Sequence, residues 1–170
     1  HRIPRGIRQP RRLRCHGTSG LVGAGRTAVE LNMGEIRGRV LIRGRATGRL
    51  CRLSKPISLW GGVEPTTGRI IDPRHPDYGR DITGSVLVLP STIGSSSSSA
   101  IMLELLRQRH APAAVVLGSV DAILTLGVIV VREMGYPSIP VVAVDDVAML
   151  PAVGMVTVTE DGWIRMSSEK

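Results

Sequence analysis

Five consecutive serines, residues 95–99, follow Gly94 and form the stretch of this sequence best suited to chemistry. The run lies between an apolar segment, residues 86–89, that ends at Pro90 and an apolar-periodic segment that begins near Ala100. A turn from a buried strand into a helix places backbone N–H groups and the positive helix end beside the turn. A hydroxyl there could be held partly as an alkoxide or could help to bind a carboxylate or phosphate. A flexible linker or a helix cap would have the same composition, so position alone leaves both interpretations open.

A second group of candidate residues lies in the stretch of residues 55–80, which is rich in proline and glycine. Gly61 and Gly62 follow Trp60 there, and paired glycines let a ligand approach the backbone closely, although they also serve ordinary turns. His75 stands among prolines, where a lone histidine is more often a structural or surface residue than a ligand. Loops of this length in compact domains often carry function.

Several classes of site are disfavoured by the residues that the chain lacks. The four histidines have no metal-ligand spacing, so we expect no metal site in this chain. The sequence has only two cysteines, Cys15 and Cys51, which cannot supply the thiolates that an iron–sulfur cluster needs. We expect Cys51 to be a small buried thiol. Neither a phosphate loop nor a dinucleotide glycine motif is present.

The elements that must position the candidate residues follow a strand–helix–strand–helix–strand order. Continuous apolar strands that alternate with helices predict a parallel or mostly parallel layer covered by helices. The expected strands are residues 37–45, 48–53, 86–89, 114–117 and 141–144, the helices are 100–109 and 120–134, and a hairpin joins 156–159 to 163–166. In the second helix we expect Ser119 as the N-cap, Asp121 in the first turn and a break or kink at Gly127.

The positive charge of the chain is concentrated at its N-terminal end. Residues 1–52 carry a net charge of +11, whereas residues 53–170 carry −3. We expect residues 1–34 to be a disordered basic leader and residues 35–170 to be a single domain. A targeting peptide and a nucleic-acid-binding arm are alternative interpretations of the leader, which has no aromatic residue to stack on bases. No secretory signal or membrane span is recognisable in the sequence, so we expect a cytoplasmic protein.

Between positions 36 and 160, many residues match the aconitase X swivel domain in the same order along the chain, so this region resembles that domain. The matching residues are Pro56, Ile57, Ser58, Leu59, Trp60, Gly61, Gly62, Val63, Thr67, Gly68, Ile71, Asp72, His75, Pro76, Gly84, Val86, Leu87, Val88, Leu89, Pro90, Gly94, Ser95, Leu103, Glu104, Leu105, Ala111, Pro112, Ala113, Gly127, Pro140, Val141 and Val142. The resemblance implies a swivelling β/β/α domain, with a mostly parallel β-layer under helices and a second β-layer.

The resemblance also implies a hydro-lyase that is active only with a large aconitase X subunit or domain. That partner is expected to carry the iron or iron–sulfur cluster, so this chain alone would bind no cofactor. Ser95 matches the family's swivel serine and is the predicted catalytic base. The predicted substrate-binding residues are Gly61, Gly62, Gly94 and Ser96.

One departure from the family bears on the substrate. Many relatives have Arg or Lys just before the Gly-Ser pair, whereas this chain has Ser91, Thr92 and Ile93. Loss of that cation favours dehydration of cis-3-hydroxy-L-proline to 1-pyrroline-2-carboxylate over dehydration of mevalonate 5-phosphate, which remains the alternative. A non-catalytic basic binding module is the alternative of another class. A phosphohistidine carrier is disfavoured, because the Gly-Ser turn contains no histidine.

Overall fold

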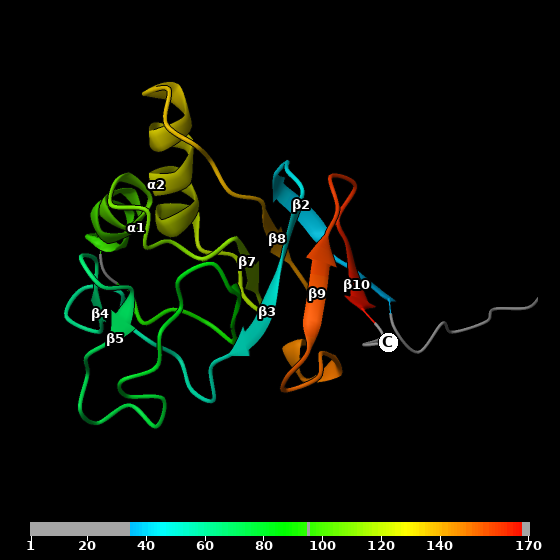
Figure 1. The fold of residues 1–170 in the computed structure, drawn as a ribbon, viewed down its shortest axis with the longest axis horizontal. Helices are drawn as coiled ribbons and strands as arrows, with labels where there is room; N and C mark the ends of the chain where they lie inside the picture. The colour runs from blue at the N-terminus through cyan, green and yellow to red at the C-terminus, as the bar shows by residue number, and fades with distance from the viewer. Residues whose placement is uncertain (1–34, 95, 168–170) are drawn as a thin grey trace, which may run out of the picture. The chain divides into compact units, whose positions relative to one another are not determined.

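The described part of the chain is built from three layers, a pair of helices and two large β-sheets that share one strand, as Figure 1 shows. A separate two-stranded sheet lies within residues 63–70. The computed structural model describes residues 35–94 and 96–167, so the predicted basic leader, residues 1–34, lies outside the described residues. The strands are β1 (Glu35–Arg37), β2 (Arg39–Ile42), β3 (Ala46–Arg52), β4 (Val63–Glu64), β5 (Arg69–Ile70), β6 (Val86–Leu89), β7 (Ala114–Leu117), β8 (Val141–Ala143), β9 (Met155–Val158) and β10 (Trp163–Ser167). The helices are α1 (Ser98–Arg107), α2 (Ala122–Glu133) and a 3₁₀ turn, Val147–Met149.

Strand β3 belongs to both large sheets. Residues 46–49 pair antiparallel with β9, and residues 50–52 pair parallel with β6. The central layer runs β3, β6, β7 and β8 in parallel, with β2 antiparallel on its edge. The outer layer runs β1, β10, β9 and β3, all antiparallel. This arrangement confirms the predicted mostly parallel layer under helices and the second β-layer.

The central strands are apolar throughout because both of their faces are buried. Leu87 and Leu89 of β6 pack in the core under the helices, whereas Val86 and Val88 pack in the core against the outer sheet. All four side chains are at most 1% exposed. Alternating side chains of one strand therefore fill two cores, which explains a continuous apolar run without the usual polar alternation.

The expectations about the start of the second helix and about a break at Gly127 were wrong. Its N-cap is Asp121, not Ser119, because the Asp121 carboxylate accepts hydrogen bonds from the backbone N–H groups of Ile123 and Leu124. Gly127 does not break α2, which runs without interruption from Ala122 to Glu133. Instead it lets the two helices pack closely, since a Cβ atom at Gly127 would lie 2.5 Å from the carbonyl oxygen of Ser99 on α1. In the described part of the chain, neither helix is long and apolar enough to cross a membrane.

Candidate active site

Both strand-to-helix turns meet at one edge of the central sheet. In a parallel layer the carboxyl ends of neighbouring strands lie side by side, so the turn from β6 to α1 approaches the turn from β7 to α2. A hollow of about 230 Å³ lies between the two turns. Its lining residues are Ser91, Thr92, Gly94, Ser119, Val120, Asp121, Ala122 and Ile123.

One short hydrogen bond joins the two turns. The Thr92 hydroxyl donates to Oδ2 of Asp121 over 2.6 Å, and the pair is half-buried. The other carboxylate oxygen of Asp121 caps α2 by accepting from the Ile123 and Leu124 N–H groups at 2.8 and 3.0 Å. Sequence reasoning gave Asp121 only a helix-start role. The sequence did contain a signal for a role at the candidate site, because Asp121 follows a buried strand just as the serine run does.

The turn after β6 also touches the glycine-rich loop. Ile57 forms a parallel bridge with Thr92, and the Ile93 N–H donates to the Ile57 carbonyl over 2.9 Å. These contacts bring the predicted Gly61 and Gly62 segment beside the turn that leads to Ser95. A second hollow, of about 480 Å³, opens there and is lined by Ser58, Trp60, Gly61, Gly62, Asp72, Pro73 and Arg74.

The predicted site residues thus occupy neighbouring segments but not one common hollow. Gly94 lines the first hollow, and Gly61 and Gly62 line the second. Ser96 is exposed and lines neither of the two, although its carbonyl accepts from the Ser99 hydroxyl over 3.4 Å. Ser95 lies outside the described residues. The roles of all five residues remain predictions.

The paired glycines differ in what holds them in place. Gly61 is exposed with a φ of +71° and open space around it, whereas Gly62 is buried against Ser58 and Ile57. A Cβ atom at Gly62 would overlap the Ser58 carbonyl oxygen. The backbone of Gly62 also accepts a hydrogen bond from the Ile71 N–H at 2.9 Å, which joins the two sides of the loop. Gly62 is therefore a packing position at the base of the second hollow.

We expect Gly62→Ala to destabilise the domain by about 2 kcal/mol, because the added methyl group must displace backbone atoms. Gly61→Ala is expected to cost only about 1 kcal/mol, the penalty of a left-handed backbone conformation without a clash. Urea denaturation of the two variants checks the difference. Equal losses in both variants would contradict the packing role of Gly62.

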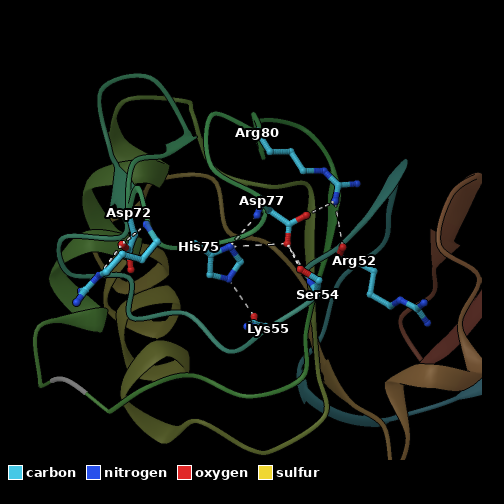
Figure 2. Close-up of polar contacts among 8 residues, drawn as sticks. Arg52, Ser54, Lys55, Asp72, His75, Asp77 and Arg80 are labelled. Atoms are coloured by element: carbon cyan, nitrogen blue, oxygen red, sulfur yellow. Dashed lines mark hydrogen bonds and ion pairs between the residues drawn. The ribbon is translucent and has the colours of Figure 1, made fainter.

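A partly buried polar cluster anchors the same loop to the end of β3. Figure 2 shows Asp77 at its centre, between His75 and Arg80. Oδ2 of Asp77 accepts from the Ser54 N–H and hydroxyl at 2.9 and 2.8 Å, and Oδ1 accepts from Arg80 at 3.1 Å. Arg80 also donates to the Arg52 carbonyl over 3.1 Å. Burial raises the pKa of Asp77, but the hydrogen bonds from Ser54 and Arg80 outweigh it and hold the pKa below its usual value.

His75 belongs to this cluster as a structural residue. Its side chain is only 4% exposed. Nδ1 accepts from the Asp77 N–H at 3.1 Å, so the ring proton must be on Nε2, which donates to the Lys55 carbonyl over 3.2 Å. The imidazole therefore joins both ends of the 55–80 loop, and both ring nitrogens are occupied. This agrees with the structural interpretation of His75.

Cys51 is buried and free, as predicted, and burial raises the pKa of its thiol. A raised pKa keeps the thiol protonated and unreactive at neutral pH. Within residues 35–94 and 96–167, no three His, Cys, Asp or Glu side chains come together in a group that could hold a metal ion.

Comparison with known proteins assigns the family. Residues 35–166 match the family described as the aconitase X swivel domain. The chain is 40% identical over 124 residues to a cis-3-hydroxy-L-proline dehydratase of Hypocrea jecorina, covering 72% of this chain and 21% of that protein. It is 38% identical over 95 residues to a phosphomevalonate dehydratase small subunit of Methanothermobacter thermautotrophicus, covering 56% of this chain and 72% of the relative.

A solved structure has the same fold. The crystal structure of Thermococcus kodakaraensis aconitase X in its holo-form superposes with a TM-score of 0.71 at 31% identity, covering 79% of this chain and 98% of that chain. The chain spans about a fifth of the length of the hydroxyproline dehydratases that it matches. The family match over residues 35–166 and the fold shared with aconitase X lead to the same assignment. The chain belongs to the aconitase X swivel domain family.

Proposed function

We propose that this chain is the swivel part of a hydro-lyase and that it supplies Ser95 as the base that removes a substrate proton. The observation that carries the proposal is the sheet edge at which Gly94 lines a hollow between the starts of two helices. Unpaired N–H groups in the first turn of a helix favour negative charge. An alkoxide on the residue after Gly94 would be stabilised by such groups, which a serine needs in order to act as a base.

We further propose that a large aconitase X part completes the site and carries the iron or iron–sulfur cluster. When bound there, such a centre would assist departure of the substrate hydroxyl group. The relatives named small subunits support a two-part enzyme, and so does the fact that the match covers only about a fifth of the hydroxyproline dehydratases. This chain would contribute the proton-removing residue and part of the substrate enclosure.

The hollow beside Gly94 favours a substrate without a phosphate group. None of the eight described residues that line it is Lys, Arg or His, and the one charged side chain among them is the carboxylate of Asp121. A phosphate group carries nearly two negative charges, so the Asp121 carboxylate would repel it. cis-3-Hydroxy-L-proline has one carboxylate and a cationic amine, so it suits the hollow better than mevalonate 5-phosphate does.

The substrate proposal is tested by offering both compounds to the full-length enzyme with its large part and following dehydration by proton NMR. We expect turnover of cis-3-hydroxy-L-proline and no turnover of mevalonate 5-phosphate. Turnover of the phosphorylated acid alone would overturn the substrate assignment and favour the alternative. Absence of turnover with either compound, in an enzyme loaded with iron, would overturn the hydro-lyase proposal.

A stripe of exposed apolar side chains on α2 is the surface that we propose the large part covers. Ile123, Leu126, Val130 and Met134 lie three or four residues apart on one helix face and are 36–56% exposed. An apolar groove of about 250 Å³ runs beside the stripe, between α1 and α2. Ile123 also lines the hollow beside Gly94, so the stripe is continuous with the candidate site. Contiguous apolar surface of this kind marks an interaction site.

We expect Leu126→Glu to weaken binding of the chain to its separately produced large part at least tenfold, a change of about 1.4 kcal/mol. The reason is that the glutamate would have to be desolvated inside an apolar contact. Val153→Glu is the matched control, because Val153 is 74% exposed and lies before β9 in the outer sheet. Isothermal titration measures both. Equal affinities for Leu126→Glu and the parent chain would rule out α2 as the docking surface.

A further inference from the structure

We propose that Thr92 and Asp121 form a clasp that positions the turn leading to the serine run, and that this clasp sets the rate of proton removal. The inference rests on the proposed function, and it adds two positioning residues to the predicted site. Both residues also line the hollow beside Gly94, but the clasp itself requires no contact with the substrate. Their part is to hold the backbone from which the base projects.

The Asp121 carboxylate is divided between two tasks. Oδ1 accepts two N–H groups of its own helix, whereas Oδ2 accepts the hydroxyl of Thr92, 29 residues earlier in the chain. A hydroxyl that donates to an ionised carboxylate over 2.6 Å makes a charge-assisted bond, which is stronger than a neutral one. The α2 N-terminus and the turn after β6 are therefore joined through a single side chain.

The same short segment is held from its other side by the glycine-rich loop. The Ile57 bridge to Thr92 and the hydrogen bond from the Ile93 N–H to the Ile57 carbonyl fix the backbone at these two positions. Thr92 thus lies between two supports, with its backbone against Ile57 and its side chain on Asp121. The β6-to-α1 turn begins from a fixed point.

Among the described residues before the serine run, Thr92 is the last that a side-chain hydrogen bond holds in place. Ile93 is 56% exposed, and a Cβ atom added at Gly94 would have no other part of the described chain within 4 Å. A change in the backbone direction at Thr92 would displace Ser95, which follows three residues later. Displacement of a reacting group by about 1 Å can lower a rate about 100-fold.

The experiment compares two threonines that donate to the same residue. Thr92→Val removes the clasp at nearly constant volume. Thr125→Val is the matched control, because the Thr125 hydroxyl donates over 2.6 Å to the backbone carbonyl of Asp121 and lines neither hollow. Thr92→Ser restores a hydroxyl at the clasp. Full-length enzyme with its large part is used for all kinetic measurements.

We expect Thr92→Val to lower kcat at least tenfold with KM within twofold of the parent. Thr125→Val is expected to lower the thermal midpoint by a similar amount while kcat stays unchanged, and Thr92→Ser should recover most of the lost rate. The inference is overturned if Thr92→Val keeps the parental kcat, or if Thr92→Ser is as slow as Thr92→Val. If Thr92→Val does not fold, the decision falls to Asp121→Asn, which keeps a good N-cap and removes the charge from the clasp.

A second measurement tests the clasp independently of the proposed dehydration reaction. Amide hydrogen exchange of residues 93–97 in the enzyme should rise in Thr92→Val and stay parental in Thr125→Val. If the parent enzyme dehydrates neither substrate, the proposed function fails while this exchange difference still tests the clasp. Unchanged exchange in Thr92→Val would show that the turn is held without it.

Discussion

Replacement of Ser95 by alanine is expected to lower kcat for dehydration by a factor of about 10² to 10⁴, the usual cost of removing a general base. A serine hydroxyl is a weak base in water. Its use as a base requires stabilisation of the alkoxide by N–H groups at the helix start and by cations from the large part. Because these supports remain in the variant, folding and partner binding should be nearly unchanged.

The control for this prediction is Ser99→Ala in the same serine run. The Ser99 hydroxyl donates to the Ser96 carbonyl over 3.4 Å within the first turn of α1, so its loss should cost less than about 1 kcal/mol of stability and little activity. Exchange of the substrate α-hydrogen in deuterated water measures the proton-removal step directly. Parental exchange in Ser95→Ala would assign the base to another residue.

Local patterns in the sequence were sufficient to predict the parallel layer and its helices, whereas the second β-layer was expected from the family resemblance. Each expected central strand matches an observed one, and residues 86–89 and 114–117 coincide with β6 and β7. The C-terminal hairpin was also correct, with β9 and β10 paired around residues 159–162. Periodicity and apolar runs determine such elements locally, and βαβ connections leave few ways of assembling them.

The errors arose where two distant parts of the chain decide the outcome. A glycine inside a helix suggests a break. At Gly127, however, the reason for glycine is steric, because any side chain there would collide with the backbone of α1 at Ser99. The N-cap of α2 is Asp121 although Ser119 is also a good capping residue, and Asp121 has a further partner in Thr92. Propensity rules describe one segment at a time, so they could not identify either contact.

The same limit applies to the polar residues of the loop. Asp77 appeared in no sequence pattern, because its partners Ser54 and Arg80 lie on different segments, 23 residues before it and three after it. Gly61 and Gly62 line a hollow in the loop beside the turn after β6, and their predicted role in substrate binding stays a prediction. That Gly62 is packed against backbone, whereas Gly61 is open, became evident only in three dimensions.

Removal of the Asp77 carboxylate is expected to lower the stability of the domain more than removal of any other carboxylate in the loop. Asp77→Ala removes the acceptor of the Ser54 N–H and one of the two acceptors of the Arg80 guanidinium, in a site where the Asp77 side chain is only 14% exposed. Loss of these hydrogen bonds to a carboxylate is expected to cost on the order of 2–3 kcal/mol in total. Asp72→Ala is the matched control in the same loop, and its more exposed carboxylate, bonded to the Arg74 N–H, should cost less than about 1 kcal/mol.

The pH dependence of this loss identifies its cause. The pKa of Asp77 is lowered in the folded protein, so the carboxylate stabilises the fold fully above its unfolded pKa, about 3.9. That contribution disappears as the pH falls through the lower folded pKa. The difference in unfolding free energy between the parent and Asp77→Ala, measured by urea denaturation, should therefore be constant from pH 7 to 5 and shrink below pH 4. A difference that stays the same down to pH 2 would mean that packing, and not the ionised carboxylate, holds the loop against β3.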